Sequence, residues 1–138
     1  MSDVEVTFPL IEDISMSVAK KYGMIQDGES KIQAVRAVFV IDPAGIIRTI
    51  IYYPLSLGHN FDELYRVVIA LQTADAFSVA TPADWRPGDR VIVPPAGSCG
   101  VAKDRVDGAE EGVECEDWFF CTKDLPEQEV LDRVLAKD

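Results

Sequence analysis

Apolar residues occupy successive positions, rather than alternate ones, along residues 35–54 of the chain. Two runs rich in β-branched and aromatic residues flank a turn, which predicts a β-hairpin. In the turn, Asp42 can accept a local hydrogen bond, Pro43 fixes φ, and Gly45 tolerates a positive φ. The spacing and the turn chemistry therefore predict two antiparallel strands.

Both strands of this hairpin are apolar on both faces. Alternation assigns the residues of each strand to two opposite faces. In the first strand one face carries Val35, Ala37, Phe39 and Ile41 and the other Arg36, Val38, Val40 and Asp42. In the second strand one face carries Ile46, Ile50 and Tyr52 and the other Ile47, Ile51 and Tyr53. A sheet of this kind needs cover on both sides, so the segment predicts the central strands of a layered α/β domain. Central strands also need neighbours, and the chain offers few, so the hairpin predicts association with a second copy or a partner chain. Arg36 is the one polar residue that interrupts the pattern early.

Helical spacing and end signals predict three helices. They are Asp13 or Ser15 to Tyr22, Phe61 to about Ala74, and about Pro126 to Ala136. Gly23 follows the first as its C′ residue, and Asn60 with Glu63 forms a capping-box-like start to the second. The expected buried stripes are Ile14, Val18 and Tyr22; Phe61, Leu64, Val68 and Leu71, widened by Tyr65, Val67 and Ile69; and Val130, Leu131, Val134 and Leu135.

Residues 77–138 differ in character from the preceding part. They begin with a turn-rich segment, continue into a short extended piece at Val91–Val93 that two prolines end, and then become rich in glycine and acids over residues 96–114. An aromatic patch follows between Cys115 and Cys121. This pattern predicts an arm that packs on another element, with an irregular segment over 96–114.

Length and composition narrow the function classes. The 138 residues fit one domain with a real core, and 48% hydrophobic residues favour a folded chain. A net charge of −11 argues against nucleic acid and anionic membrane partners. No apolar run approaches the length of a membrane span, and the N-terminus lacks a secretory pattern, so a cytoplasmic location is expected. Three cysteines, an odd number, argue against a disulfide-stapled secreted domain.

Blocks spread over nearly the whole chain are similar to the peroxiredoxins. They are Phe8-Pro9-Leu10-Ile11-Glu12-Asp13, Tyr22-Gly23, Arg36-Ala-Val-Phe-Val-Ile-Asp42, Tyr52-Tyr53-Pro54, Leu57-Gly58 and Asp62-Glu63-Leu64. Thr81-Pro82-Ala83-Asp84-Trp85, Gly88-Asp89 and Val91-Ile92-Val93-Pro94-Pro95 resemble the long-arm subgroup, which holds the one-cysteine-type and archaeal enzymes. The resemblance implies an α/β fold with a partial thioredoxin-like layered sheet. Residues 1–76 would form the C-terminal half of that domain and residues 77–138 its C-terminal arm.

The family's activity is thiol-dependent reduction of hydroperoxides, in which a thiolate attacks the O–O bond and becomes a sulfenic acid. The attacking cysteine lies in a Pro-x-x-x-Thr-x-x-Cys motif, and this sequence contains no such motif: none of Cys99, Cys115 and Cys121 has threonine three residues before it. Three readings follow. The chain is a fragment, one half of a split enzyme, or a degenerate relative, and in each case it is expected to be inactive alone.

Two positions match the family's active-site cations. Arg36 matches the family's arginine, which lowers the pKa of the attacking thiol and orients the peroxide. The alternative is that Arg36 is a surface arginine at the start of a strand. His59 stands where the family usually has a second arginine, which is a departure. A histidine can donate a hydrogen bond there, but its charge is conditional near neutral pH, and a solvated loop histidine is the alternative.

Two of the three cysteines have a counterpart in the family. Cys115 and Cys121 match the paired arm cysteines of the archaeal long-arm enzymes, where they resemble resolving thiols; the alternative is that both fill apolar space among the neighbouring aromatic residues. Cys99 has no counterpart and is expected to be an exposed thiol without an assigned role. The C-x5-C spacing of Cys115 and Cys121, together with the single histidine of the chain, argues against a metal site, and no cofactor is expected.

Two functional hypotheses remain open. The first is the C-terminal portion of a peroxiredoxin that needs an N-terminal half or a partner, a hydroperoxide substrate and a thioredoxin-like reductant. The second is a catalytically inactive peroxiredoxin-like protein that keeps a binding or dimerisation surface. Both predict a homo-oligomer or a partner chain, and neither predicts nucleic acid or membrane binding.

Overall fold

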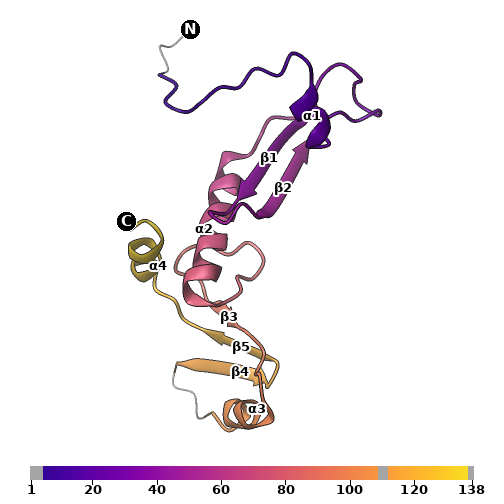
Figure 1. The fold of residues 1–138 in the computed structure, drawn as a ribbon. Helices are drawn as coiled ribbons and strands as arrows, with labels where there is room; N and C mark the ends of the chain where they lie inside the picture. The colour runs from indigo at the N-terminus through magenta and orange to yellow at the C-terminus, as the bar shows by residue number, and fades with distance from the viewer. Residues whose placement is uncertain (1–4, 109–111, 137–138) are drawn as a thin grey trace. The chain divides into compact units, whose positions relative to one another are not determined.

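The computed structural model describes residues 5–108 and 112–136. The chain forms two compact units, Met1–His59 and Asn60–Asp138, each of which is described by itself. Along the sequence the elements are α1 (Ser17–Lys21), β1 (Arg36–Ile41), β2 (Ile47–Tyr53), α2 (Phe61–Phe77), β3 (Val91–Val93), α3 (Cys99–Val106), β4 (Val113–Asp117), β5 (Phe120–Lys123) and α4 (Glu127–Val134) (Figure 1). Among the described residues, no helix has the length and apolar character needed to cross a membrane.

Helix α1 is shorter than predicted. It begins at Ser17, and Asp13, one of the two predicted caps, accepts hydrogen bonds from the backbone N–H groups of Val18 and Ala19 at 3.2 and 2.8 Å. Gly23 follows the helix with φ of 67°, as predicted. The predicted buried stripe is wrong: Ile14, Val18 and Tyr22 are exposed, and Ala19 is the buried residue of the helix. A helix of five residues has room for only one inward position, and Ile14 precedes it.

The cap makes the start of the first unit sensitive to acid. Hydrogen bonds from the Ala19 and Val18 amides and from Ser17 hold the pKa of Asp13 below its ordinary value of 3.8, against a smaller opposing effect of desolvation. Because the folded pKa is depressed, the stabilisation is present above pH 3.8 and is lost as the pH falls through the lowered pKa. We expect the Val18 and Ala19 amide resonances to titrate with a midpoint below 3.8 in NMR spectra. Asp13→Asn should abolish this titration, and a midpoint above that value would contradict the cap.

The predicted hairpin is confirmed. Strands β1 and β2 pair antiparallel, with Phe39 opposite Ile50. Asp42 Oδ1 accepts hydrogen bonds from the backbone N–H groups of Ala44 and Ile46, both at 2.9 Å, and Gly45 adopts a φ of 82°. The turn therefore has the chemistry that its sequence indicates.

The register of the hairpin departs from strict alternation. A bulge lies between Val40 and Ile41, so that Ile41 pairs with Ile47. Ile47 consequently lines the same face as Ile50 and Tyr52, whereas simple alternation assigned it to the opposite face. One extra residue on one strand is enough to change the face on which the following residue lies.

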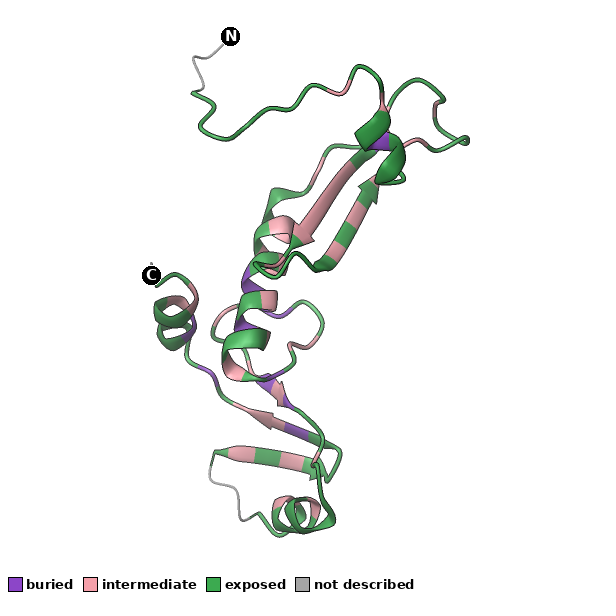
Figure 2. Cartoon of the chain, in the orientation of Figure 1, coloured by how far each residue is buried: buried purple, intermediate pink, exposed green. Residues whose placement is uncertain are grey.

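The described residues leave much of the hairpin exposed, although the pattern predicted cover on both faces. It is a two-stranded sheet, and Ile41, Ile47 and Ile50 are each about half exposed, at 46, 48 and 45%. Figure 2 shows both strands coloured as intermediate or exposed throughout. An apolar patch of this kind is a feature of surfaces that bind another chain. The described residues supply no further strand for this sheet. Tyr22 packs edge to face on Phe39, with 4.9 Å between the ring centroids, but leaves the isoleucines of that face about half exposed.

In the second unit, helix α2 starts as predicted. The Asn60 side chain accepts hydrogen bonds from the backbone N–H groups of Asp62 and Glu63. Glu63 pairs with Arg66 through two hydrogen bonds, at 2.6 and 2.8 Å, so it does not act as the second member of a capping box. Those hydrogen bonds are the main reason that the pKa of Glu63 lies below its ordinary value.

The buried face of α2 differs from the predicted stripe. Phe61, Tyr65 and Val68 are exposed, whereas Ile69, which was part of the predicted stripe, is buried together with Ala70 and Thr73. Among the described residues of the second unit, the buried apolar side chains form one core cluster, which is Ile69, Ala70, Val79, Trp85, Val91, Leu125 and Val130. Helix α2 thus packs with residues from the segment 77–138, which has a core only together with this helix. The boundary between the two compact units lies after residue 59. The boundary at residue 76 that the family resemblance implies is one between a domain and its arm, and it stays a prediction.

A three-stranded antiparallel sheet in the order β3-β5-β4 completes the second unit. Strand β3 and helix α4 were predicted, and Val130 of α4 is fully buried. The prediction of an irregular segment over residues 96–114 is wrong for part of its length, because α3 forms at Cys99–Val106. Ser98 caps this helix by accepting a hydrogen bond from the Val101 amide at 3.3 Å. Residues 109–111 lie outside the described residues.

Candidate functional site: an arginine at a strand start and a disulfide in a hairpin

Arg36 is the first residue of β1 and is exposed. Its Nε donates a hydrogen bond to the backbone carbonyl of Leu55 at 3.2 Å. This bond ties the guanidinium to the segment that follows β2, and leaves the two terminal nitrogens of the fork for another group. A guanidinium held in this way can form bidentate hydrogen bonds to an oxyanion or approach a thiolate.

Tyr53 links Arg36 to His59. It lies directly opposite Arg36 in the register of the hairpin, and its ring meets that of His59 edge to face, with 5.0 Å between the ring centroids. The His59 Nε2 atom is buried and has no hydrogen-bond partner among the described residues. Tyr53, which belongs to the family-like block Tyr52-Tyr53-Pro54, is therefore the register partner of Arg36 and the ring partner of His59.

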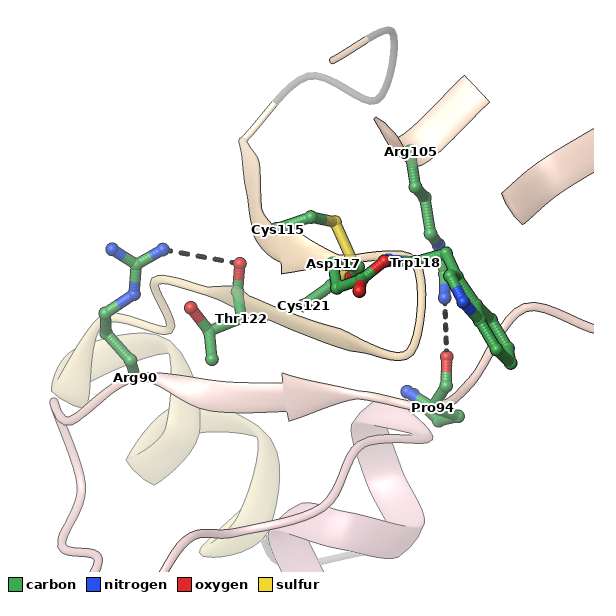
Figure 3. Close-up of a disulfide and its surroundings, with 8 residues drawn as sticks. All are labelled: Arg90, Pro94, Arg105, Cys115, Asp117, Trp118, Cys121 and Thr122. Atoms are coloured by element: carbon green, nitrogen blue, oxygen red, sulfur yellow. Dashed lines mark hydrogen bonds between the residues drawn. A yellow bond between two sulfur atoms is a disulfide. The ribbon is translucent and has the colours of Figure 1, made fainter. Parts of the chain in front are cut away.

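Cys115 and Cys121 are joined by a disulfide, with Cα atoms 4.0 Å apart. Cys115 lies on β4 and Cys121 directly opposite on β5, so the antiparallel register of this hairpin brings them together (Figure 3). Cys121 is 1% exposed, whereas Cys115 is half-buried. The sequence left open whether these residues were reactive thiols or separate apolar fillers. Six residues of separation across a tight turn was the signal that they face one another.

Two arginines connect the elements around the disulfide hairpin: Arg90 contacts the hairpin itself, and Arg105 ties α3 to the end of β3. Arg90 donates from Nη2 to the Thr122 carbonyl at 3.3 Å and forms ion pairs with Glu114 and Asp124. Arg105 of α3 donates from Nη1 to the Pro94 carbonyl at 2.8 Å (Figure 3). Exposed ion pairs contribute little individually, but together these contacts attach β4 and α3 to the strands that carry the core.

Cys99 is a free, exposed thiol at the first position of α3. It lines a shallow depression of about 440 Å³ together with residues 96–98, Ala102 and Trp118. Trp118 is half exposed and meets Phe119 edge to face at the tip of the disulfide hairpin. Within residues 5–108 and 112–136, no group of three histidine, cysteine or acidic side chains is placed to hold a metal ion.

The arginine group belongs to the first compact unit and the disulfide to the second. The first can stabilise negative charge on oxygen or sulfur. The second can store two electrons as a pair of thiols and release them by thiol–disulfide exchange. Both are properties of redox proteins that act through cysteine.

Two sequence families match parts of the chain. The AhpC/TSA family matches residues 1–50, and the C-terminal domain of 1-Cys peroxiredoxin matches residues 70–107. A peroxiredoxin of Methanosarcina mazei is 55% identical over 123 residues, which are 89% of this chain and 56% of that protein. The peroxiredoxin 2 of Caldanaerobacter subterraneus is 49% identical over 120 residues, with 87% and 54% covered. The chain therefore spans about half the length of the curated relatives it matches.

Solved structures agree with these matches. A yeast mitochondrial 1-Cys peroxiredoxin, described for its thiol-resolving mechanism through glutathione and thioredoxin systems, has a TM-score of 0.64 at 33% identity, with 79% of this chain and 52% of that chain covered. The peroxiredoxin 6 of Arenicola marina has a TM-score of 0.68 at 34% identity, with 83% and 55% covered. These neighbours define the fold as part of a thioredoxin-like α/β architecture. The chain belongs to the peroxiredoxin family, and its residues 70–107 match the C-terminal domain of 1-Cys peroxiredoxin.

Proposed function

We propose that this chain is the C-terminal portion of a thiol-dependent peroxidase that reduces hydroperoxides and needs an N-terminal half or a partner chain for activity. The observation that carries the proposal is the 55% identity to a peroxiredoxin over 89% of the chain. The attacking cysteine would be supplied by the other half, because the printed sequence has no Pro-x-x-x-Thr-x-x-Cys motif. A cytoplasmic location and assembly into a homo-oligomer belong to the same proposal.

Arg36 would serve the attacking sulfur. Its terminal nitrogens would donate hydrogen bonds to the peroxide oxygens and favour the thiolate over the thiol. The Nε bond to the Leu55 carbonyl supports this role, since it fixes the guanidinium before substrate arrives. His59, with a buried Nε2 atom that lacks a partner, would complete its hydrogen bonding with a group of the missing half.

Cys115 and Cys121 would act as resolving thiols. The attacking thiolate displaces an alcohol or water from the hydroperoxide and becomes a sulfenic acid; an arm thiol then condenses with this acid, a disulfide forms and water leaves. The second arm thiol, as its thiolate, would then attack the arm sulfur of this disulfide, so that the Cys115–Cys121 disulfide forms and the attacking thiolate leaves. A thioredoxin-like dithiol would reduce the arm disulfide again.

The partly exposed hairpin supports the need for a second polypeptide. Its exposed face carries a depression of about 400 Å³ lined by Lys21, Tyr22, Phe39, Ile47, Ile50 and Tyr52. Strands of the missing half would cover this face and pair with the hairpin edges, and so remove apolar surface from water.

Reconstitution tests the proposal. An N-terminal half carrying the motif is added to the chain, and hydroperoxide consumption is followed with thioredoxin, thioredoxin reductase and NADPH. We expect no turnover by the chain alone and turnover by the mixture. Replacing both Cys115 and Cys121 by serine should abolish thioredoxin-linked turnover but leave one rapid round of peroxide reduction, whereas Cys99→Ser should leave turnover unchanged. Full thioredoxin-linked turnover in the double variant would show that the two cysteines do not resolve.

A catalytically inactive binding protein is the second candidate, and the apolar face of the hairpin is the observation that favours it. In that case the mixture would form a stable complex, visible by light scattering, and would consume no peroxide. A chain that stays a monomer and binds no N-terminal half would contradict both candidates.

A further inference from the structure

The geometry of the sheet points to a fixed direction of thiol–disulfide exchange: we propose that an external thiolate attacks the sulfur of Cys115, and that Cys121 is the sulfur that leaves. The inference deepens the proposed function, since it concerns the same cysteine pair. It requires only that the disulfide can be reduced, and does not require peroxidase activity.

The two sulfurs occupy unequal places in the sheet. The strand order is β3-β5-β4, so Cys121 lies on the central strand and Cys115 on an edge strand (Figure 1). In the register, Val93 of β3 is opposite Cys121, and Cys121 is opposite Cys115. Directly opposed residues of antiparallel strands share a face. Val93, Cys121 and Cys115 therefore form a row across one face, and the S–S bond lies within this row.

The row decides which sulfur can be reached. A thiolate attacks a disulfide sulfur from the side opposite the leaving sulfur, so access along the line of the S–S bond matters. At Cys121 this approach comes from the side of Val93, which is 9% exposed, and Cys121 itself is 1% exposed. At Cys115 the approach comes from the outer side of β4, where the sheet ends. Helix α3 also contacts β4, yet Cys115 keeps an exposure that Cys121 lacks.

The exchange balances in two steps. The external thiolate forms a mixed disulfide with the sulfur of Cys115 while the S–S bond breaks, and the electron pair leaves with Cys121 as a thiolate. A second external thiolate then attacks the external sulfur of the mixed disulfide, which releases the oxidised reductant and the Cys115 thiolate. The Cys121 sulfur lies 3.6 Å from the Asp117 carbonyl oxygen, so this thiol can donate a hydrogen bond there once it is protonated.

Glutathione is a suitable probe, because it leaves a mass label on the sulfur that it attacks. The oxidised chain, with Cys99→Ser to prevent exchange with the free thiol, is treated briefly with reduced glutathione. The released thiolate is trapped at once with iodoacetamide, and peptides are mapped by mass spectrometry. We expect glutathione on Cys115 and the alkyl group on Cys121 in about tenfold excess or more over the reverse product. Equal labelling, or glutathione mainly on Cys121, would overturn the proposal.

A matched pair of variants tests the role of Val93. Val93→Ala removes the side chain in line with the S–S bond and should narrow the labelling ratio several-fold, while Ile92→Ala, which faces the other side of the same strand, should leave it unchanged. Circular dichroism confirms that each variant is folded. An identical ratio in Val93→Ala and the parent would show that Val93 does not block attack. Failure of the reconstituted peroxidase, with the labelling ratio intact, would count against the proposed function and not against this direction of exchange.

Discussion

Replacing Arg36 by alanine is expected to slow hydroperoxide reduction by the reconstituted enzyme about 10²- to 10³-fold, the usual effect of removing one hydrogen-bond donor from a developing negative charge. The guanidinium is held at the start of β1 by its bond to the Leu55 carbonyl, so the loss is one of charge stabilisation at a fixed position. Arg36→Lys should recover part of the rate of hydroperoxide reduction, because lysine keeps the positive charge but cannot donate two parallel hydrogen bonds as the planar guanidinium does. The measurement is the rate of a single turnover in stopped-flow fluorescence.

Arg48 offers a matched control for this variant. It lies on the same hairpin and pairs with Asp42 beside the turn, with 3.6 Å between nitrogen and oxygen. Because this end of the hairpin has no place in the proposed mechanism, Arg48→Ala should leave the rate within about twofold of the parent. If Arg36→Ala and Arg48→Ala behave alike, Arg36 is a surface arginine and the alternative reading of the sequence is correct.

Trp85→Ala is expected to lower the free energy of unfolding of the second unit by about 3–5 kcal/mol, the usual cost of deleting a buried large aromatic side chain. Trp85 is 1% exposed within the core cluster, and its Nε1 donates a hydrogen bond to the Asp89 carbonyl at 3.1 Å. The variant therefore loses apolar contacts in the core and the hydrogen bond to the Asp89 carbonyl. Urea unfolding followed by circular dichroism measures the change.

Trp118 provides the comparison for Trp85 within the same chain. It is 48% exposed and its closest aromatic partner is Phe119, which is also exposed. Trp118→Ala should therefore change the free energy of unfolding by no more than about 1 kcal/mol. Equal effects of the two substitutions would mean that the core of the second unit is not centred on Trp85.

Local signals in the sequence were reliable where a short stretch of chain decides the outcome. The hairpin turn at residues 42–45, the Asn60 cap of α2 and the positive φ of Gly23 depend on one or two residues and their own backbone. Helix α3 was missed because its segment is rich in glycine and charge, and its start depends on one serine cap. Propensity alone is a weak guide in such a segment.

The buried faces were predicted less well, because they depend on what the rest of the chain supplies. Spacing made Phe61 and Val68 candidates for the core of α2, but Trp85 and Val130 pack instead against the face that carries Ile69 and Ala70. The hairpin residues are apolar on both sides, yet the described residues provide neither a further strand at the edges nor enough cover to bury Ile41, Ile47 and Ile50. A hydrophobic stripe predicts that a face will be buried, but it does not predict which part of the protein will pack against that face.

By itself the sequence determined the family, the hairpin and its turn, and the residues able to carry charge or exchange electrons, because each of these depends on residue type and near spacing. Only the tertiary structure decided that Cys115 and Cys121 face one another, that Tyr53 is opposite Arg36 in the register and meets the ring of His59, and that one sulfur lies on a central strand and the other on an edge. Those relations depend on strand register and strand order, which a linear pattern does not contain.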